Sequence, residues 1–139
     1  MAYLLDTNVV SELRKGSKAD PAVIKWAEST AKDRHHLSVL TLGEIRKGIE
    51  TLRRRAADQA QVFDAWLVRL RNDYADDILP ITPEIADQWG RLNSIRSMPV
   101  IDGLLAATAL SHGLTLATRN VRDFSNTGIS WVNPFESGT

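Results

Sequence analysis

A chain of 139 residues is long enough to bury one hydrophobic core, and we expect residues 1–139 to form a single domain. It contains no cysteine, which excludes disulfides, thiolate zinc sites and thiol nucleophiles. Its 17 Lys and Arg residues balance 17 Asp and Glu residues, so the net charge gives no indication of a nucleic-acid partner.

The N-terminal half alternates short apolar runs with segments of helical character. Residues 3–5 are apolar and are followed at once by the polar residues 6–8, which predicts a buried strand that ends at a functional edge. We then expect a helix over 9–13, a helix that starts at Asp20-Pro21, a strand over 37–40, and a helix from Thr41 to about residue 55.

This N-terminal segment also bears on localisation. It lacks a basic stretch and reaches the charged Asp6 too soon for a secretory signal. No apolar run in the sequence approaches the roughly 18 residues that cross a membrane. We therefore expect a soluble, cytoplasmic protein that makes no contact with a membrane.

The C-terminal half continues the alternation. We expect helices over 57–71, from Thr82-Pro83 to before Pro99, and from Asp102 to a left-handed turn at Gly113, with strands over 78–81, 114–117 and 129–132. Strands that alternate with helices indicate an α/β fold with a parallel central sheet of about five short strands, flanked by helices on both faces.

Acidic and amide side chains recur where these elements meet. Asp6 follows the first strand, Glu44 and Asp102 lie near helix starts, and Asn120 and Asp123 follow the fourth strand. Ligands of parallel sheets sit at the carboxyl ends of the strands, so one edge can gather these residues. Carboxylates about 4 Å apart repel by roughly 4 kcal/mol per pair at an effective dielectric of 20. Three ionised acids therefore need a bound cation or must take up protons.

Each of these residues also has a purely structural interpretation. Asp6 and Asp102 fit the N-cap position of the helices that follow them. Thr41-x-x-Glu44 fits a capping box, in which the glutamate bonds the backbone N–H of the capping residue. Asn120 and Asp123 are typical of turns in a loop. The combination of residues, rather than any one of them, indicates a site for a hard cation such as Mg²⁺.

Basic residues crowd into 46–55, with further ones at Arg69, Arg71, Arg119 and Arg122. One interpretation is that they form solvated helix faces. The other is a cationic rim around an acidic pocket, which a polyanion needs in order to approach carboxylates.

Five segments of the sequence resemble the PIN-domain ribonucleases, and among them the VapC-type toxins and the related FitB group. These segments are Leu4-Leu5-Asp6-Thr7-Asn8-Val9-Val10-Ser11-Glu12, Leu37-Ser38 through Thr41-x-x-Glu44-Ile45-x-x-Gly48, Asp102-Gly103-Leu104-Leu105-Ala106-Ala107-Thr108-Ala109, Ala117 to Phe124, and Asn133-Pro134-Phe135. They come in family order and span nearly the whole chain.

The resemblance implies a PIN-like three-layer fold and a Mg²⁺- or Mn²⁺-dependent endoribonuclease. It further implies a homodimer that is expressed with a small VapB-like antitoxin. The antitoxin would block the acidic site, and the complex would contact DNA only through the antitoxin. Asp6 and Asp102 would be direct metal ligands, and Glu44 a ligand directly or through water. Many relatives carry an acid immediately after the Thr-Arg pair, where this chain has Asn120, so Asn120 and Asp123 are both candidates for the fourth catalytic position. Supporting or substrate-contacting roles fall to Thr7, Asn8, Thr118 and Arg119.

Two other enzyme classes fit the sequence less well. A zinc hydrolase needs histidines at helical spacing, but His35 and His36 are adjacent and His112 stands alone. An aspartyl-phosphate phosphatase needs a second acid two residues after Asp6, where Asn8 stands. We expect the histidines to be structural or at the surface.

The alternative from another functional class is a weakly catalytic or non-catalytic PIN module that acts with an antitoxin in DNA-binding autoregulation. The presence of Asp6, Glu44 and Asp102 favours catalysis over this alternative. In relatives, elements similar to 23–31 and 41–55 receive the antitoxin. Trp26 fits either a core position or an anchor for that contact.

Overall fold

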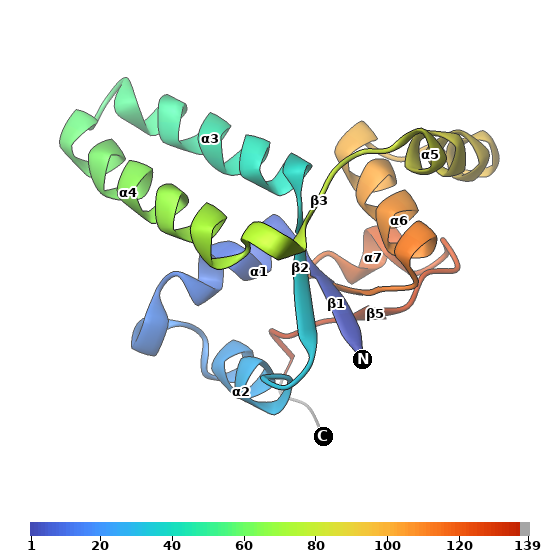
Figure 1. Cartoon of the computed structure of the whole chain (residues 1–139), viewed down its shortest axis with the longest axis horizontal. Coiled ribbons are helices and arrows are strands. Elements are labelled where there is room, and N and C mark those ends of the chain that lie inside the picture. The colour runs from blue at the N-terminus through green and yellow to red at the C-terminus, as the bar shows by residue number, and fades with distance from the viewer. Residues whose placement is uncertain (137–139) are drawn as a thin grey trace.

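The computed structural model describes residues 1–136, which form an α/β structure around one sheet (Figure 1). Its strands are β1 (Ala2–Leu5), β2 (Arg34–Ser38), β3 (Ile78–Leu79), β4 (Thr115–Ala117) and β5 (Trp131–Val132). Its helices are α1 (Thr7–Leu13), α2 (Pro21–Ser29), α3 (Val39–Arg53), α4 (Ala57–Asp73), α5 (Pro83–Ile95), α6 (Val100–His112) and α7 (Val121–Phe124), with short 3-10 turns at Gly16–Lys18 and Ala75–Asp77. No helix in this part of the chain has the length and apolar character needed to cross a bilayer.

The five strands pair in the order β3-β2-β1-β4-β5, and every pair is parallel. This confirms the predicted α/β fold with a parallel sheet. The central strand β1 is buried on both sides, because Leu4 and Leu5 are both fully inaccessible to solvent. An all-parallel sheet needs helices on both faces, and this chain supplies them.

Successive residues of β1 point into two separate cores. Tyr3 and Leu5 pack with residues of α1, α3 and α4, whereas Leu4 packs with residues of α6 and with Phe124 of α7. Figure 1 shows α1 to α4 gathered on one side of the sheet and α5 to α7 on the other. The molecule therefore has the three layers that the sequence predicted.

Several predicted boundaries were wrong, and the second strand is the clearest case. The strand predicted over 37–40 ends at Ser38, and Val39 already belongs to α3. The Ser38 side chain caps the helix by accepting a hydrogen bond of 3.0 Å from the backbone N–H of Leu40. A short apolar run does not distinguish a strand from the first turn of a buried helix.

The last helices also begin elsewhere than predicted. Helix α6 starts at Val100 after Pro99, so Asp102 lies in its first turn and is not its cap. Both Asn120 and Asp123 were predicted to lie in a loop, but Asp123 belongs to α7 and Asn120 directly precedes that helix. Phe124 is fully buried and holds this one-turn helix against the second core. Gly113 ends α6 with a φ of 64°, as predicted.

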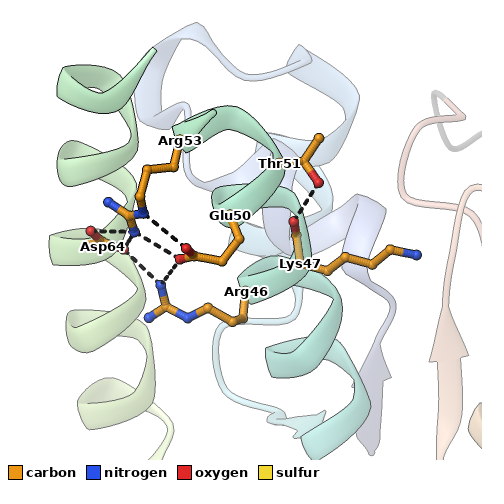
Figure 2. Close-up of polar contacts among 6 residues, drawn as sticks. All are labelled: Arg46, Lys47, Glu50, Thr51, Arg53 and Asp64. Atoms are coloured by element: carbon orange, nitrogen blue, oxygen red, sulfur yellow. Dashed lines mark hydrogen bonds and ion pairs between the residues drawn. The ribbon is translucent and has the colours of Figure 1, made fainter. Parts of the chain in front are cut away.

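The basic segment of α3 pairs with acids along the α3–α4 hairpin (Figure 2). Arg53 donates to both carboxylate oxygens of Asp64 at 2.7 and 2.9 Å, and Arg46 reaches the same carboxylate at 2.8 Å. Both arginines also bond Glu50. The Arg53 and Arg46 guanidinium groups hold the pKa of Asp64 below its usual value. This geometry favours the helix-face interpretation for Arg46 and Arg53, whereas Lys47 points away from the network.

Candidate metal centre

Asp6 lies between the end of β1 and the start of α1, with only 5% of its surface exposed. One carboxylate oxygen accepts a hydrogen bond of 2.7 Å from the backbone N–H of Thr7. The other accepts one of 2.7 Å from Thr118 Oγ1 and a longer one of 3.4 Å from Asn8 Nδ2. Asp6 is thus the N-cap of α1, and it is also held rigidly at the carboxyl end of the sheet.

Glu44 projects from α3 toward the same edge. Its Oε1 accepts a hydrogen bond of 2.6 Å from Thr7 Oγ1, which lies 3.4 Å from the hydroxyl of the fully buried Thr41. The capping-box interpretation of Glu44 was wrong, because Ser38 caps α3 and Glu44 bonds a residue of α1 instead. Thr7 therefore links the segment that carries Asp6 to the helix that carries Glu44.

Asp102 completes the group of acids from the first turn of α6. Burial raises its pKa, and the charges of Asp6, Asp123 and Glu44 raise it further, in that order. Burial also raises the pKa of Asp6, and the charge of Glu44 adds to this effect, although hydrogen bonds from Thr118, Thr7 and Asn8 act against it. The structure thus brings four sequence-predicted acids, contributed by β1–α1, α3, α6 and α7, into one region of negative potential.

The two candidates for the fourth position differ in their surroundings. Asn120 precedes α7, and its backbone N–H donates to Thr118 Oγ1 at 3.0 Å while its side chain makes no cap. Asp123 is one turn further on, where its charge acts on Asp102. Only Asp123 therefore adds to the negative potential.

The remaining predicted residues surround this group. Thr118 is fully buried and joins Asp6 to the backbone of Asn120 through its single hydroxyl. Asn8 Oδ1 accepts a hydrogen bond of 3.2 Å from the backbone N–H of Arg119. Sequence reasoning missed the buried hydroxyl of Thr41 beside Thr7, because Thr41 was assigned to the cap of α3. The sequence signal for the start of α3 is Ser38, a good N-cap residue that directly precedes the helix.

The histidines belong to other parts of the structure. His35 stacks on Trp26 with ring centroids 5.4 Å apart, and Trp26 packs against the first core. His36 lies 3.6 Å from a carboxylate oxygen of Asp77, and His112 is at the end of α6. Trp26 therefore occupies the core position that the sequence allowed.

The donor chemistry of the acidic group fits a hard divalent cation. Carboxylate oxygens are the ligands that Mg²⁺ prefers, and Mg²⁺ keeps several waters when it binds protein. Burial is the main cause of the raised pKa values of Asp6 and Asp102, and a cation would stabilise both ionised carboxylates and relieve the repulsion that adds to this effect. In residues 1–136, no three Asp, Glu or His side chains already converge as a complete ligand set.

Comparison with known proteins adds a family to this geometry. The model of the PIN domain family matches residues 3–129, which is most of the chain. The chain belongs to the PIN-domain family. This PIN domain is 32% identical to the VapC ribonuclease Y4jK of Sinorhizobium fredii, over 96% of this chain and 97% of that protein. It is 29% identical to the toxin FitB of Neisseria gonorrhoeae, over 95% of this chain and 97% of that one.

Solved structures resemble this PIN domain along its whole length. FitAB bound to an IR36 DNA fragment matches with a TM-score of 0.86 and 28% identity, over 99% of this chain and 98% of that one. FitAcB from Neisseria gonorrhoeae matches with a TM-score of 0.85 and 30% identity, over 96% of this chain and 99% of that one. The fold and the family therefore agree with the resemblance found in the sequence motifs.

Proposed function

We propose that this PIN domain is the endoribonuclease toxin of a VapBC-type toxin–antitoxin module, dependent on Mg²⁺ or Mn²⁺ and inhibited by its cognate antitoxin. The observation that carries this proposal is the group of acids at the carboxyl end of the sheet, in which Asp6 and Glu44 are held by Thr118 and Thr7. The resemblance to a VapC ribonuclease supports the same activity.

Asp6, Glu44 and Asp102 are the residues that would hold the cation. When bound, the cation supplies an acidified water and polarises the scissile phosphate. Thr7 and Thr118 keep the carboxylates of Glu44 and Asp6 in place, so that neither has to reorganise when the cation enters. Asp123 is a better candidate than Asn120 for the fourth catalytic position, since its charge already acts on Asp102.

Hydrolysis of the RNA forms a bond between the water oxygen and phosphorus and breaks the bond from phosphorus to the 3′ oxygen, which takes up a proton. The products are a 5′-phosphate and a 3′-hydroxyl. Finding a 2′,3′-cyclic phosphate instead would exclude this mechanism, because that product requires attack by the ribose hydroxyl.

The partners follow from the same comparison. The solved relatives include FitAB, bound to DNA in one structure, and FitAcB. We propose that this chain forms a homodimer that binds a VapB-like antitoxin, and reaches DNA only through it. An antitoxin arginine entering the acidic group would replace the cation with a bidentate guanidinium. Raising the Mg²⁺ concentration should then weaken inhibition, and unchanged inhibition would contradict direct competition.

The test is cleavage of total cellular RNA by purified, antitoxin-free protein in Mg²⁺, in EDTA, and after Asp6→Asn. We expect discrete fragments from the wild-type protein in Mg²⁺, and none in EDTA or from the variant prepared identically. The absence of cleavage in both Mg²⁺ and Mn²⁺ would favour a second candidate, a non-catalytic module that acts with an antitoxin on DNA. Asn120, which stands where many relatives have an acid, is the residue that favours this second candidate.

A further inference from the structure

Two pockets share Glu44 and Gly48 in their walls, and they differ in chemistry. One has a volume of about 620 Å³ and is lined by the apolar residues Val39, Leu40 and Ile101 and by the cations Lys47 and Arg55, but by no aromatic ring. The other, which we call the basic-aromatic pocket, has a volume of about 420 Å³. It lies between α1, α3, α4 and the C-terminal segment, and Thr7 and Asn8 of the acidic site also line it.

Cations and aromatic rings are paired in the basic-aromatic pocket. The Arg14 guanidinium lies 4.4 Å from the ring centre of Phe63 and 5.9 Å from that of Trp66. The Arg119 guanidinium lies 4.6 Å from the ring centre of Phe135. Such pairs are attractive through the ring quadrupole, and they hold the planar guanidinium groups in defined positions.

In the part of the chain that the structure describes, Arg14 and Arg119 are not held in direct ion pairs, although the charge of Arg119 is among the causes that lower the pKa of Glu12. The pocket contains one other cation and two acids, and Lys15 is paired with Glu12 at 2.9 Å. Within the described residues 1–136, neither Arg14 nor Arg119 forms an ion pair with a carboxylate. Positive charge therefore stands directly beside the acidic group, with Glu44 at the boundary between the two.

We propose that the basic-aromatic pocket binds a nucleotide of single-stranded RNA adjacent to the scissile phosphate. This inference rests on the proposed ribonuclease function. Arg14 and Arg119 contact the phosphates on either side of that nucleotide, and its base stacks on an exposed guanidinium or aromatic face. A volume of about 420 Å³ is within the size of pockets that hold small ligands.

The pairing of cations with aromatic rings, beside the acidic site, favours RNA over a peptide in this pocket. A strand that presents its scissile phosphate to Asp6 and Glu44 must pass next to a wall of the pocket, because Thr7, Asn8 and Glu44 line it. Cations at that point offset the repulsion between the acids and the phosphate backbone. An apolar peptide side chain is better matched by the larger pocket around Val39, Leu40 and Ile101.

The test measures binding of a fluorescein-labelled single-stranded RNA of random sequence, in Mg²⁺, to full-length protein that carries Asp6→Asn to prevent cleavage. Arg119→Gln and Arg14→Gln should each weaken binding and reduce the slope of log affinity against log salt by about 0.7, the value for one phosphate contact on a single strand. Phe135→Leu should weaken binding roughly 5- to 100-fold without changing that slope, because it removes a stacking face and no charge. Phe135→Tyr retains the ring and should bind normally.

Arg91→Gln is the matched control, because it also removes one exposed arginine. Arg91 lies on α5, which packs on α6, and it does not line the basic-aromatic pocket. It should leave both affinity and slope unchanged. The inference is overturned if RNA binding is unchanged in Arg14→Gln, Arg119→Gln and Phe135→Leu. This holds also if these variants lose antitoxin binding, because the pocket would then serve the antitoxin and not the RNA. RNA cleavage by the wild-type protein is measured separately. If the wild type cuts RNA while the pocket variants bind RNA normally, the proposed ribonuclease function stands and only the inference about the pocket fails.

Discussion

The ionised carboxylate of Asp102 lowers the stability of the metal-free fold. Asp102 is negatively charged in the first turn of a helix, which favours it by about 0.3–1 kcal/mol. Its pKa is nevertheless raised by burial and by the charges of Asp6, Asp123 and Glu44, so desolvation and repulsion oppose the ionised form. A binding site for a cation is expected to show this conflict, because the ligand that relieves it is part of the functional state.

Asp102→Asn should therefore stabilise the metal-free protein. A carboxyl whose folded pKa is raised destabilises the fold when ionised, and this penalty is relieved as the pH falls through the folded pKa. At neutral pH in EDTA, we expect the variant to have a higher Tm, by roughly 4 °C for each kcal/mol of repulsion removed. Mg²⁺ should raise the Tm of the wild type and have little effect on the variant.

Asp76→Asn serves as the control for this experiment, because Asp76 is exposed and lies in the 3-10 turn before β3. It should leave the Tm and its response to Mg²⁺ unchanged. A lower Tm for Asp102→Asn in EDTA would show that the carboxylate stabilises the fold, and it would contradict the repulsion argument.

The burial of His35 leads to a prediction about how the stability of the fold depends on pH. Burial is the main cause of its lowered pKa, with Asp33 and the hydrogen bond to Thr30 acting in the other direction. The unfolded chain then binds a proton more readily than the folded one, so stability is complete above the unfolded pKa of about 6.5 and is lost as the pH falls below it. His35→Phe keeps the stacking on Trp26 and should flatten this acid loss in urea unfolding between neutral and mildly acidic pH.

The residues of the site were more accessible to sequence reasoning than their contacts. Asp6, Glu44 and Asp102 could be selected because acids placed after strands and near helix starts gather at one edge of a parallel sheet. The bond from Thr7 to Glu44 could not be predicted, because it depends on how α1 and α3 pack. The basic-aromatic pocket was missed for the same reason, since Arg14, Phe63 and Phe135 are far apart in sequence.

At the scale of elements, helix periodicity predicted which segments are helical better than where they begin. Thr82 was correctly predicted to cap α5, because a hydroxyl before proline is a local signal. The starts of α3 and α6 were misplaced, because their boundary residues were assigned to other elements. Ser38, which caps α3, was assigned to the second strand, and Pro99, which directly precedes α6, was used only as the limit of the helix before it.

The packing of α5 against α6 leads to a prediction about Gly103, the neighbour of Asp102. A Cβ at Gly103 would lie 3.0 Å from Cδ1 and Nε1 of Trp89 and 3.3 Å from Nδ2 of Asn93. Gly103→Ala should thus displace the start of α6, with an overpacking cost of about 1–3 kcal/mol that is partly offset by the better helix propensity of alanine. We expect weaker Mn²⁺ binding by calorimetry and slower RNA cleavage, with a Tm that falls by at most roughly 8 °C.

A second substitution separates positioning from general damage. Trp89→Phe in the Gly103→Ala background makes room for the new methyl group and should restore part of the Mn²⁺ affinity. Gly90→Ala is the control on the same helix α5, because its Cβ would meet no atom within 4 Å. It should gain up to about 1 kcal/mol of stability and bind Mn²⁺ normally. If Gly103→Ala binds Mn²⁺ as tightly as the wild type, then this contact does not position Asp102.

For the whole molecule, the parallel sheet brings together residues that lie far apart in the sequence. Asp6 and Thr118 are 112 positions apart, yet β1 and β4 are neighbours, and their carboxyl ends place these side chains 2.7 Å apart. The alternation of strands and helices predicts that the sheet is parallel, but it does not determine which strands are the neighbours of β1. That choice depends on the burial of Leu4 and Leu5 in two separate cores.

Thr118→Val should therefore destabilise the whole fold as well as the site. Valine has the same shape, but it removes the hydroxyl that donates to Asp6 and accepts from the backbone of Asn120. Leaving the buried Asp6 carboxylate without this bond should cost roughly 1.5–3 kcal/mol, the range for hydrogen bonds to charged groups.

Urea unfolding measures the loss, and Thr118→Ser should recover most of it because serine keeps the hydroxyl. In the Asp6→Asn background the effect of Thr118→Val should shrink, since the charge that depends on the bond is gone. Equal losses in both backgrounds would mean that valine acts on the packing around β4 and not through Asp6.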